Sequence, residues 1–288
     1  MMNPRIGAFL AEDLGPHDCD ISVESIGPAA ARQAVGRVMA KSMGIIFGLG
    51  LIEAVVRSVE ERRRWSGNAG QAAVVTLLAQ DGTEVKPGTV IAEVTGPVGT
   101  LLTAERTLLN LVQRLSGVAT LTRAFVDAMR GTRCRLLDTR KTTPGLRDLE
   151  KAAVRAGGGV NHRFGLFDMV MLKDNHITAM GGDIRAAVAA ARSRVGPAVK
   201  IEVEVATFEQ LEMAIDAGAD IIMLDNMSPE RMKRCVDRVA GRIPLEASGG
   251  ITLETIAAAA ATGVDYVSVG AVTHSARALD ISMKITLA

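Results

Sequence analysis

Basic side chains gather in two short stretches of the chain, the first of which follows a run of residues typical of a β-strand. The first stretch, residues 139–145, holds Arg140 and Lys141 beside the hydroxyl of Thr139, and its Pro144 is expected to open the next helix. The second, residues 157–163, contains three glycines and ends in His162 and Arg163. Such groups bind carboxylates or phosphates through charge-assisted hydrogen bonds. A solvated turn explains either stretch taken alone, so the prediction of an anion site depends on their grouping.

Four more strand-like runs bring a cation and carboxylates to the same set of positions. Lys173 closes one run, and Glu202 and Glu204 alternate with valines in the next. Residues two apart on a strand share a face, so both glutamates should point the same way. Asp225 and Glu246 are expected at the ends of the two following strands, where they suit a hydrated Mg²⁺ or ribose hydroxyls. The alternative for the glutamate pair is an edge strand with one wet face.

Glycine-containing stretches follow the last two runs. Residues 248–251 and 270–275 contain Ser248, Gly249 and Gly250 in one case and Gly270 and His274 in the other. In α/β barrels, the loops after the last strands and a helix N-terminus often bind a phosphate. The two stretches together therefore predict a phosphate site, although each alone is compatible with an ordinary turn.

The elements that position these residues form a βα repeat. Helix-length, alanine-rich segments separate six apolar runs, at residues 135–138, 169–173, 200–205, 220–225, 244–248 and 266–270. Continuous apolar runs are typical of parallel strands covered by helices. A doubly wound sheet shares this pattern, but charged residues and glycines at nearly every strand end favour a barrel, whose active site lies at that edge. Six runs, with a possible seventh at residues 159–162, predict an incomplete or irregular barrel.

The first part of the chain has a different texture. Apolar residues spaced along one face predict a helix over residues 51–65, and alternating runs predict strands at residues 73–79 and 89–94. This pattern indicates an α+β layer. Residues 81–94 also have a faint likeness to a lipoyl-type hairpin around Lys86, which we regard as a minor alternative.

Composition excludes several classes of protein. The chain has 288 residues, with 33 basic and 32 acidic side chains and 3% aromatic residues. This balance argues against disorder, a nucleic-acid surface and base-stacking platforms. Three distant cysteines and the absence of a signal-peptide pattern or a long apolar run predict a cytoplasmic protein with no membrane segment. The near-neutral total conceals a segregation of cations at the early strand ends from carboxylates and glycines at the later ones.

Eight motifs together resemble the quinolinate phosphoribosyltransferase family, also called nicotinate-nucleotide pyrophosphorylase (carboxylating), of the type II phosphoribosyltransferases. The likeness spans nearly the whole chain and is looser over residues 16–22 and 30–90. The motifs are TAERT at 103–107, LSGVAT at 115–120, DTRKTTPG at 138–145, GGGVNHR at 157–163, KDNH at 173–176, MLDNM at 223–227, EASGGI at 246–251 and SVGA at 268–271.

The resemblance implies an α/β fold and a domain plan. An N-terminal α/β sandwich, residues 1–115 joined by 276–288, precedes an irregular, open α/β barrel of six or seven strands, residues 116–275. It also implies a homodimer in which Arg106 reaches the neighbouring subunit's active site. From the residues alone, Glu105 and Arg106 suit a solvated helix face.

The implied reaction joins quinolinate to phosphoribosyl diphosphate, releases diphosphate and CO₂, and yields nicotinate mononucleotide for NAD synthesis. Mg²⁺ is expected with phosphoribosyl diphosphate, and no organic cofactor, nucleic acid or membrane is implied. The expected catalytic residues are Lys141, Lys173, Glu202 and Asp225. Glu246 and Asp225 are expected to hold the metal through water. The expected substrate-binding residues are Arg106, Thr139, Arg140, Lys141, His162, Arg163, Lys173, Glu202, Asp225, Ser248, Gly249, Gly250, Val269, Gly270, Ala271 and His274.

Two alternatives stay open. One is a related phosphoribosyltransferase of the same fold, associated with molybdate transport or accepting nicotinate without decarboxylation. The cation cluster argues for a diacid, because a monoacid would leave charges unpaired. The other alternative is a non-catalytic sugar-phosphate sensor built on the same barrel.

Overall fold

The computed structural model describes residues 4–65 and 72–288, and the chain forms two compact units. The first unit comprises Met1–Thr120 and Ala276–Ala288, and the second comprises Leu121–Ser275. The long helix α4 (Val98–Ala128) begins in the first unit and ends in the second. Among the described residues, no helix combines the length and apolar character needed to cross a membrane.

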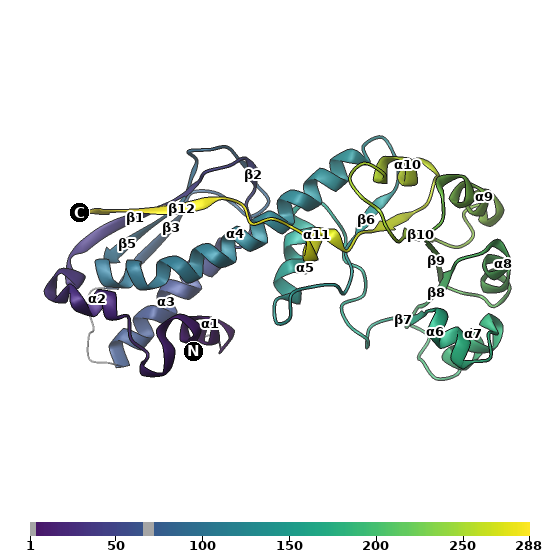
Figure 1. Cartoon of the computed structure of the whole chain (residues 1–288), viewed down its shortest axis with the longest axis horizontal. Helices are drawn as coiled ribbons and strands as arrows, with labels where there is room; N and C mark the ends of the chain where they lie inside the picture. Colours follow the sequence, from purple (N-terminus) through teal and green to yellow (C-terminus); the bar gives the residue numbers. More distant parts are fainter. Residues whose placement is uncertain (1–3, 66–71) are drawn as a thin grey trace. The chain divides into compact units, whose positions relative to one another are not determined.

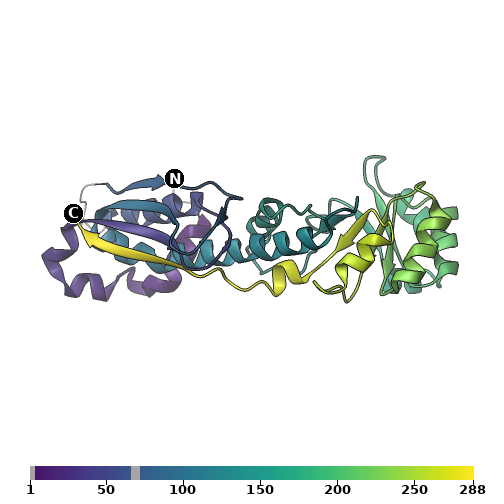
Figure 2. The same cartoon turned by 90° about the horizontal axis from the view of Figure 1, so that it is seen from above.

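An antiparallel sheet organises the first unit. Its strand order is β12-β1-β5-β3, so the last strand of the chain pairs with the first, from Ala40 opposite Ile281 to Ala34 opposite Leu287 (Figures 1 and 2). The strands of this unit are β1 (Gln33–Ala40), β2 (Gly44–Ile45), β3 (Val74–Leu77), β4 (Glu84–Val85), β5 (Val90–Pro97) and β12 (Ile281–Leu287). Its other helices are α1 (Pro4–Leu14), η1 (Gly15–His17), α2 (Ile21–Ser25), η2 (Gly27–Ala31) and α3 (Gly50–Trp65).

The core of this unit confirms the predicted helix and strands. The apolar face of α3 buries Ile52, Val55 and Val59 in the cluster that also holds the inner residues of β1 and β5. The returning C-terminal segment passes close to α4 at Gly117. A Cβ on that glycine would lie 2.0 Å from the carbonyl oxygen of Arg277, so no larger residue fits there.

The second unit is built on a six-stranded parallel sheet of order β6-β11-β10-β9-β8-β7. Figure 1 shows α7, α8 and α9 along one face of this sheet. Its strands are β6 (Arg135–Leu137), β7 (Val170–Leu172), β8 (Ile201–Val205), β9 (Ile221–Asp225), β10 (Leu245–Ser248) and β11 (Tyr266–Ser268). Its helices are α5 (Arg147–Ala156), α6 (Asp174–Ala179), α7 (Ile184–Arg192), α8 (Phe208–Asp216), α9 (Pro229–Val239), α10 (Ile256–Ala261) and α11 (Ala271–His274).

The parallel sheet is open, as predicted for an irregular barrel. Among the described residues, β6 and β7 are its two edges, and the expected seventh strand is reduced to one parallel bridge between Val160 and Leu137. Register brings the polar residues to one face of the sheet. Met223 lies opposite Glu204 on one side and Glu246 on the other. Because residues two apart share a face, Glu202 joins this face from the same strand as Glu204.

Two local predictions were wrong. Pro144 was expected to open the helix after β6, but α5 begins at Arg147, and residues 143–146 form a turn closed by the Leu146 amide on the Thr143 carbonyl. Glu246 was expected at the end of a strand. It is the second residue of β10 and is buried, so its carboxylate lies within the sheet rather than beyond its edge.

Candidate active site

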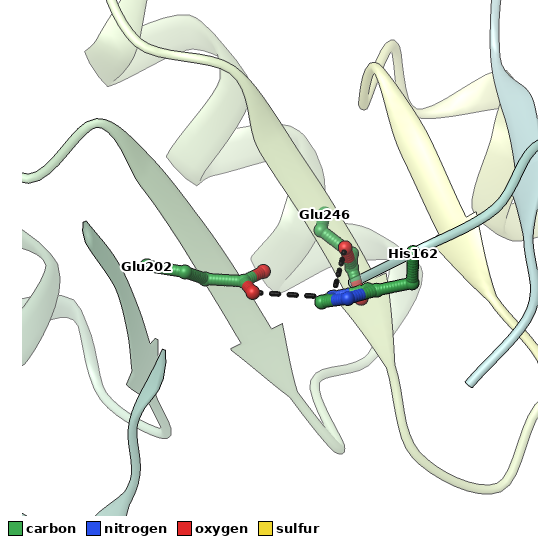
Figure 3. Close-up of side chains that lie close together, drawn as sticks. All are labelled: His162, Glu202 and Glu246. Atoms are coloured by element: carbon green, nitrogen blue, oxygen red, sulfur yellow. Dashed lines mark ion pairs between the residues drawn. The ribbon is translucent and has the colours of Figure 1, made fainter. Parts of the chain in front are cut away.

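A histidine and two glutamates meet in the interior of the second unit (Figure 3). Nε2 of His162 lies 3.1 Å from Oε2 of Glu202 and 3.3 Å from Oε2 of Glu246. Their side chains are 7%, 0% and 2% exposed, respectively. The three residues come from the segment bridged to β6, from β8 and from β10, so the register of the parallel sheet assembles the cluster.

The ring of His162 has a defined orientation. Burial works to lower the pKa of this histidine, but the carboxylates of Glu202 and Glu246 outweigh it and raise the pKa to about 10. The backbone N–H of Arg163, however, donates to Nδ1 of His162 at 2.6 Å, and only an unprotonated Nδ1 can accept it. The contact indicates the tautomer with its proton on Nε2, facing the carboxylates, and full protonation of the ring would break it.

The cluster has spare hydrogen-bond acceptors. Both carboxylate oxygens of Glu202 and Oε1 of Glu246 are buried and have no other hydrogen-bond partner within the described residues, although Oε2 of Glu202 faces Nε2 of His162. Burial and the Glu246 charge raise the pKa of Glu202 and His162 opposes the rise, which leaves the pKa at about 7. Buried acceptors without partners are costly, so these oxygens suit ligand hydroxyls or water molecules bound to a metal.

The first predicted basic stretch follows β6 and is held by the first turns of α5. Thr143 donates from its backbone N–H and from its hydroxyl to the buried carboxylate of Glu150, at 3.0 and 2.7 Å. Arg147 donates from Nε to the hydroxyl of Thr142 at 2.9 Å. These contacts fix a loop in which Lys141 is exposed and Arg140 is half-buried.

The arginines of the two basic stretches lie near each other. Burial lowers the pKa of Arg163, and the positive charge of Arg140 lowers it further. Arg163 donates to the carbonyl of Met169 at 3.1 Å, while Nε of Arg140 is buried without a hydrogen-bond partner within the described residues. Two neighbouring guanidinium groups repel each other unless an anion lies between them, so this part of the site favours a negatively charged ligand.

Lys173 directly precedes α6 and pairs with the second glutamate of β8. Its Nζ donates to Oε2 of Glu204 at 2.9 Å, with 46% of the lysine side chain exposed. Thus Glu204 neutralises a cation, whereas Glu202, on the same face of the strand, keeps free acceptor oxygens. The two glutamates therefore have different chemical environments.

Glycines shape the loops after β10 and β11. Gly249 has a φ of +94°, and a Cβ there would lie 2.3 Å from Oδ1 of Asn226, so this position requires glycine. A Cβ on Gly270 would lie 2.9 Å from Cδ of Lys141 and 3.2 Å from the ring of His274, which brings the last loop against the first basic stretch. The Thr273 hydroxyl also donates to the Lys141 carbonyl at 2.8 Å.

The remaining predicted residues lie at the same edge of the sheet, with one exception. Asp225 ends β9 half-buried opposite Ser248, whose hydroxyl accepts a 3.0 Å hydrogen bond from Ser268. Thr139, Gly250 and Val269 occupy the loops just described, and Ala271 is the first residue of α11. Arg106 belongs to the part of α4 in the other unit and is exposed.

Sequence reasoning missed the residues behind the site. Asp138, Lys151 and Glu150 are fully buried polar residues that bond to the site's loops. Asp138 was considered only as the end of a strand, and no sequence signal distinguished Lys151 from an ordinary lysine of an amphipathic helix.

An open parallel α/β sheet that gathers cations, free carboxylate oxygens and glycine loops at one edge defines an anion-binding α/β protein of the phosphoribosyltransferase type. Two family profiles cover the chain: "Quinolinate phosphoribosyl transferase, N-terminal domain" matches residues 20–116, and "Quinolinate phosphoribosyl transferase, C-terminal domain" matches residues 118–284. The chain belongs to the quinolinate phosphoribosyltransferase family.

Similar proteins agree with this assignment. The chain is 47% identical to a probable nicotinate-nucleotide pyrophosphorylase (carboxylating) of Bacillus subtilis, over 97% of this chain and 91% of the relative. It is 42% identical to the corresponding protein of Mycobacterium leprae, over 96% and 94% of the two chains. The crystal structure of NadC from Streptococcus pyogenes superposes with a TM-score of 0.91 at 41% identity, over 99% of this chain and 96% of that one.

Proposed function

We propose that this protein transfers the phosphoribosyl group of phosphoribosyl diphosphate to quinolinate, with release of diphosphate and CO₂, to give nicotinate mononucleotide for NAD synthesis. Membership of the family supports the reaction class. The observation that carries the choice of an acidic substrate is Nε of Arg140, which is buried without a hydrogen-bond partner within the described residues, in the same site as Arg163. The chain is accordingly a glycosyltransferase of the pentosyltransferase class.

Quinolinate is the ligand we assign to the cations. Its two adjacent carboxylates would accept charge-assisted hydrogen bonds from Arg140, Arg163 and Lys173, each worth roughly 1.5–3 kcal/mol. His162, which faces Glu202 and Glu246 and directly precedes Arg163, would orient the ring of the substrate. Binding in this way aims the ring nitrogen at the ribose, so that positioning supplies much of the rate enhancement.

Phosphoribosyl diphosphate is the ligand we assign to the carboxylates and glycines. The carboxylates of Glu202 and Asp225 would accept hydrogen bonds from the ribose hydroxyls. The negative charge of these two carboxylates would stabilise the oxocarbenium-like ribose as diphosphate leaves. Lys141 would neutralise the leaving diphosphate. The loops at residues 248–250 and 269–271, with His274, would hold the 5-phosphate.

Decarboxylation needs no further protein group in this scheme. Once the ring nitrogen is bonded to the ribose it is cationic and attracts electrons from the adjacent carboxylate carbon. Loss of CO₂ then requires that the arginines hold the other carboxylate in place, so no dedicated base is assigned.

Mg²⁺ is the metal we assign to the bound diphosphate substrate. It prefers oxygen ligands and retains several waters, and the free Oε1 of Glu246 and the half-buried carboxylate of Asp225 fit as acceptors for such waters. When bound, Mg²⁺ neutralises developing charge on diphosphate. His162, whose ring is committed to Arg163 and the two glutamates, is not assigned to the metal.

We further propose that the enzyme is a homodimer and that the exposed Arg106 completes the quinolinate site of the partner subunit. Subunit mixing tests this assignment. Arg106→Ala and Arg140→Ala variants are each expected to be nearly inactive, and a mixture refolded together should recover activity, because a heterodimer then contains one site with both arginines. No recovery in a mixture shown to contain heterodimers would contradict the assignment.

One assay decides between the proposed function and its alternatives. Purified protein is mixed with phosphoribosyl diphosphate, Mg²⁺ and either quinolinate or nicotinate, and both diphosphate and mononucleotide are measured. We expect turnover with quinolinate and release of CO₂. Turnover of nicotinate alone would indicate the related transferase, and thermal stabilisation by both ligands without diphosphate release would indicate a sensor.

A further inference from the structure

A buried ion pair lies on the helix-facing side of the segment that carries His162. Lys151 of α5 donates from Nζ to Oδ1 of Asp138 at 2.5 Å, and their side chains are 2% and 0% exposed. Both side chains bond to the backbone of His162 rather than to its ring. The pair therefore has no assigned part in the reaction.

The pair satisfies both backbone polar groups of His162. The backbone N–H of His162 donates to Oδ1 of Asp138 at 2.8 Å, and the carbonyl of His162 accepts from Nζ of Lys151 at 3.0 Å. Asn161, one residue earlier, donates from Nδ2 to the other carboxylate oxygen of Asp138 at 2.6 Å and to the Lys151 carbonyl at 2.9 Å. The ion pair of Asp138 and Lys151 thus holds two consecutive residues, Asn161 and His162, and we call these contacts the clamp.

These bonds continue a parallel β-ladder, with side-chain groups in place of backbone groups. The Val160 N–H donates to the Leu136 carbonyl at 2.8 Å, and the Asp138 N–H donates to the Val160 carbonyl at 3.1 Å, which is the pattern of a parallel pair. At His162 the next acceptor is the carboxylate of Asp138, and the next donor is the ammonium of Lys151. Hence the strand-like conformation extends to His162 although backbone pairing with β6 has ended.

Side chains alternate between the two sides of the extended segment at residues 160–163, and this alternation links the clamp to the cluster of His162, Glu202 and Glu246. In an extended segment, Asn161 and His162 point to opposite sides. Asn161 bonds to the ion pair on the helix side, so His162 points inward to the two glutamates, and the backbone N–H of Arg163 is placed on Nδ1 of His162. We infer that Lys151 and Asp138 are positioning residues that fix His162 and Arg163 for quinolinate.

The inference rests on the proposed function, and its test uses matched double variants. Removing one partner alone would leave a buried charge uncompensated and endanger folding. Asp138→Asn/Lys151→Met removes both charges and the donor to the His162 carbonyl. Asp138→Asn/Lys151→Gln also removes both charges but retains a donor on a side chain of the same length as methionine. Comparing the two double variants isolates the hydrogen bond to His162.

The kinetic readout is the ratio of effects on the two substrates. For the methionine variant we expect the KM of quinolinate to rise about tenfold, because a small displacement of binding groups weakens a positioned contact, and the KM of phosphoribosyl diphosphate to change by less than about twofold. The glutamine variant should recover most of the quinolinate affinity. An unchanged KM for quinolinate, equal losses for both substrates, or identical behaviour of the two variants would each overturn the inference.

Two further proteins separate positioning from stability. Val188→Ala opens a cavity under α7, away from the clamp, and should lower the Tm without changing either KM. Asn161→Ala removes the bond to Asp138 at a half-buried position and should raise the KM of quinolinate about threefold even if the methionine variant does not fold. A folded Asn161→Ala protein with the wild-type KM would also contradict the inference.

A spectroscopic measurement makes the result independent of turnover. The chain has four histidines, so ¹⁵N-histidine spectra with a His162→Gln reference assign the ring of His162. We expect its Nδ1 and Nε2 shifts to move in the methionine variant and to stay near wild type in the glutamine variant. Unmoved shifts overturn the positioning role, whereas a wild-type protein that fails to turn over quinolinate overturns the proposed function alone.

Discussion

Nε2 of His162 lies 3.1 Å from Oε2 of Glu202, deep in the second unit, and Oε1 of that glutamate makes no hydrogen bond among the described residues. Glu202 is thus a buried anion that the fold incompletely compensates. Glu246 adds a second negative charge on the other side of the ring. A buried carboxylate of this kind lowers the stability of the fold and is available to accept hydrogen bonds from a ligand. Both properties are expected of a binding site for ligand hydroxyls.

Replacement of Glu202 by Gln is expected to stabilise the protein near neutral pH. Burial raises the pKa of Glu202 from 4.5 to about 7. A carboxyl group with a raised pKa stabilises the folded chain fully below its unfolded pKa and loses that contribution as the pH rises through the folded pKa. The Glu202→Gln variant lacks this loss, so its free energy of unfolding relative to wild type should increase between pH 4.5 and 7.5, by roughly 3 kcal/mol at most.

Urea unfolding of both proteins at several pH values measures this difference, and turnover by the variant should be strongly reduced. Glu212→Gln, at an exposed ion pair with Arg238, serves as the control and should show no such pH-dependent gain. A relative stability that falls as the pH rises would refute the environment described for Glu202.

Arg140→Ala is expected to weaken quinolinate binding about tenfold to a hundredfold, the range for loss of a charge-assisted hydrogen bond. Affinity for phosphoribosyl diphosphate should change far less, because the carboxylates and glycine loops bind that substrate. Isothermal titration calorimetry with each ligand measures both constants. Arg185→Ala, which removes an exposed arginine paired with Asp216, should leave both affinities intact. If Arg140→Ala lost the same affinity for both ligands, the assignment of Arg140 to quinolinate would be wrong.

The strand ends could be predicted from the sequence, but the contacts made there could not. Apolar runs and their terminal residues indicated β6 to β11, because parallel strands covered by helices are nearly uniform in hydropathy. The meeting of His162 with Glu202 and Glu246 depends on the register of β8 and β10, which leaves no mark in local sequence. Lys151 resembles a solvated lysine until its partner Asp138 is seen across the helix–strand interface.

The error at Pro144 has a comparable origin. Proline fixes its own φ and is favoured at the first turn of a helix, so the local pattern pointed to a helix start. The loop instead continues to Leu146, because Thr143 is tied to Glu150 and Thr142 to Arg147. Tertiary hydrogen bonds that hold the basic loop here override the preference of proline for the first turn of a helix.

Gly249→Ala is expected to weaken phosphoribosyl diphosphate binding and to destabilise the fold. Its φ of +94° strains any other residue, and the added methyl group would meet Oδ1 of Asn226 at 2.3 Å. Gly218→Ala provides the control: it has a φ of +73° with nothing within 4 Å of an added Cβ, so it suffers backbone strain alone, about 1 kcal/mol. Calorimetry should show that only Gly249→Ala loses affinity for phosphoribosyl diphosphate, and equal affinities in the two variants would contradict the phosphate assignment.

Removal of Mg²⁺ is expected to abolish turnover but to leave quinolinate binding intact. The groups assigned to quinolinate are cations that need no metal, whereas diphosphate departs with charge that the basic side chains neutralise only in part. Excess EDTA should therefore stop product formation, and titration of quinolinate in EDTA should give the affinity measured with Mg²⁺.

Glu246→Gln should raise the Mg²⁺ concentration needed for half-maximal rate, because its amide accepts more weakly from metal-bound water than the free Oε1 of the carboxylate. Full activity in EDTA, or an unchanged Mg²⁺ requirement in a folded Glu246→Gln protein, would contradict the role assigned to Glu246.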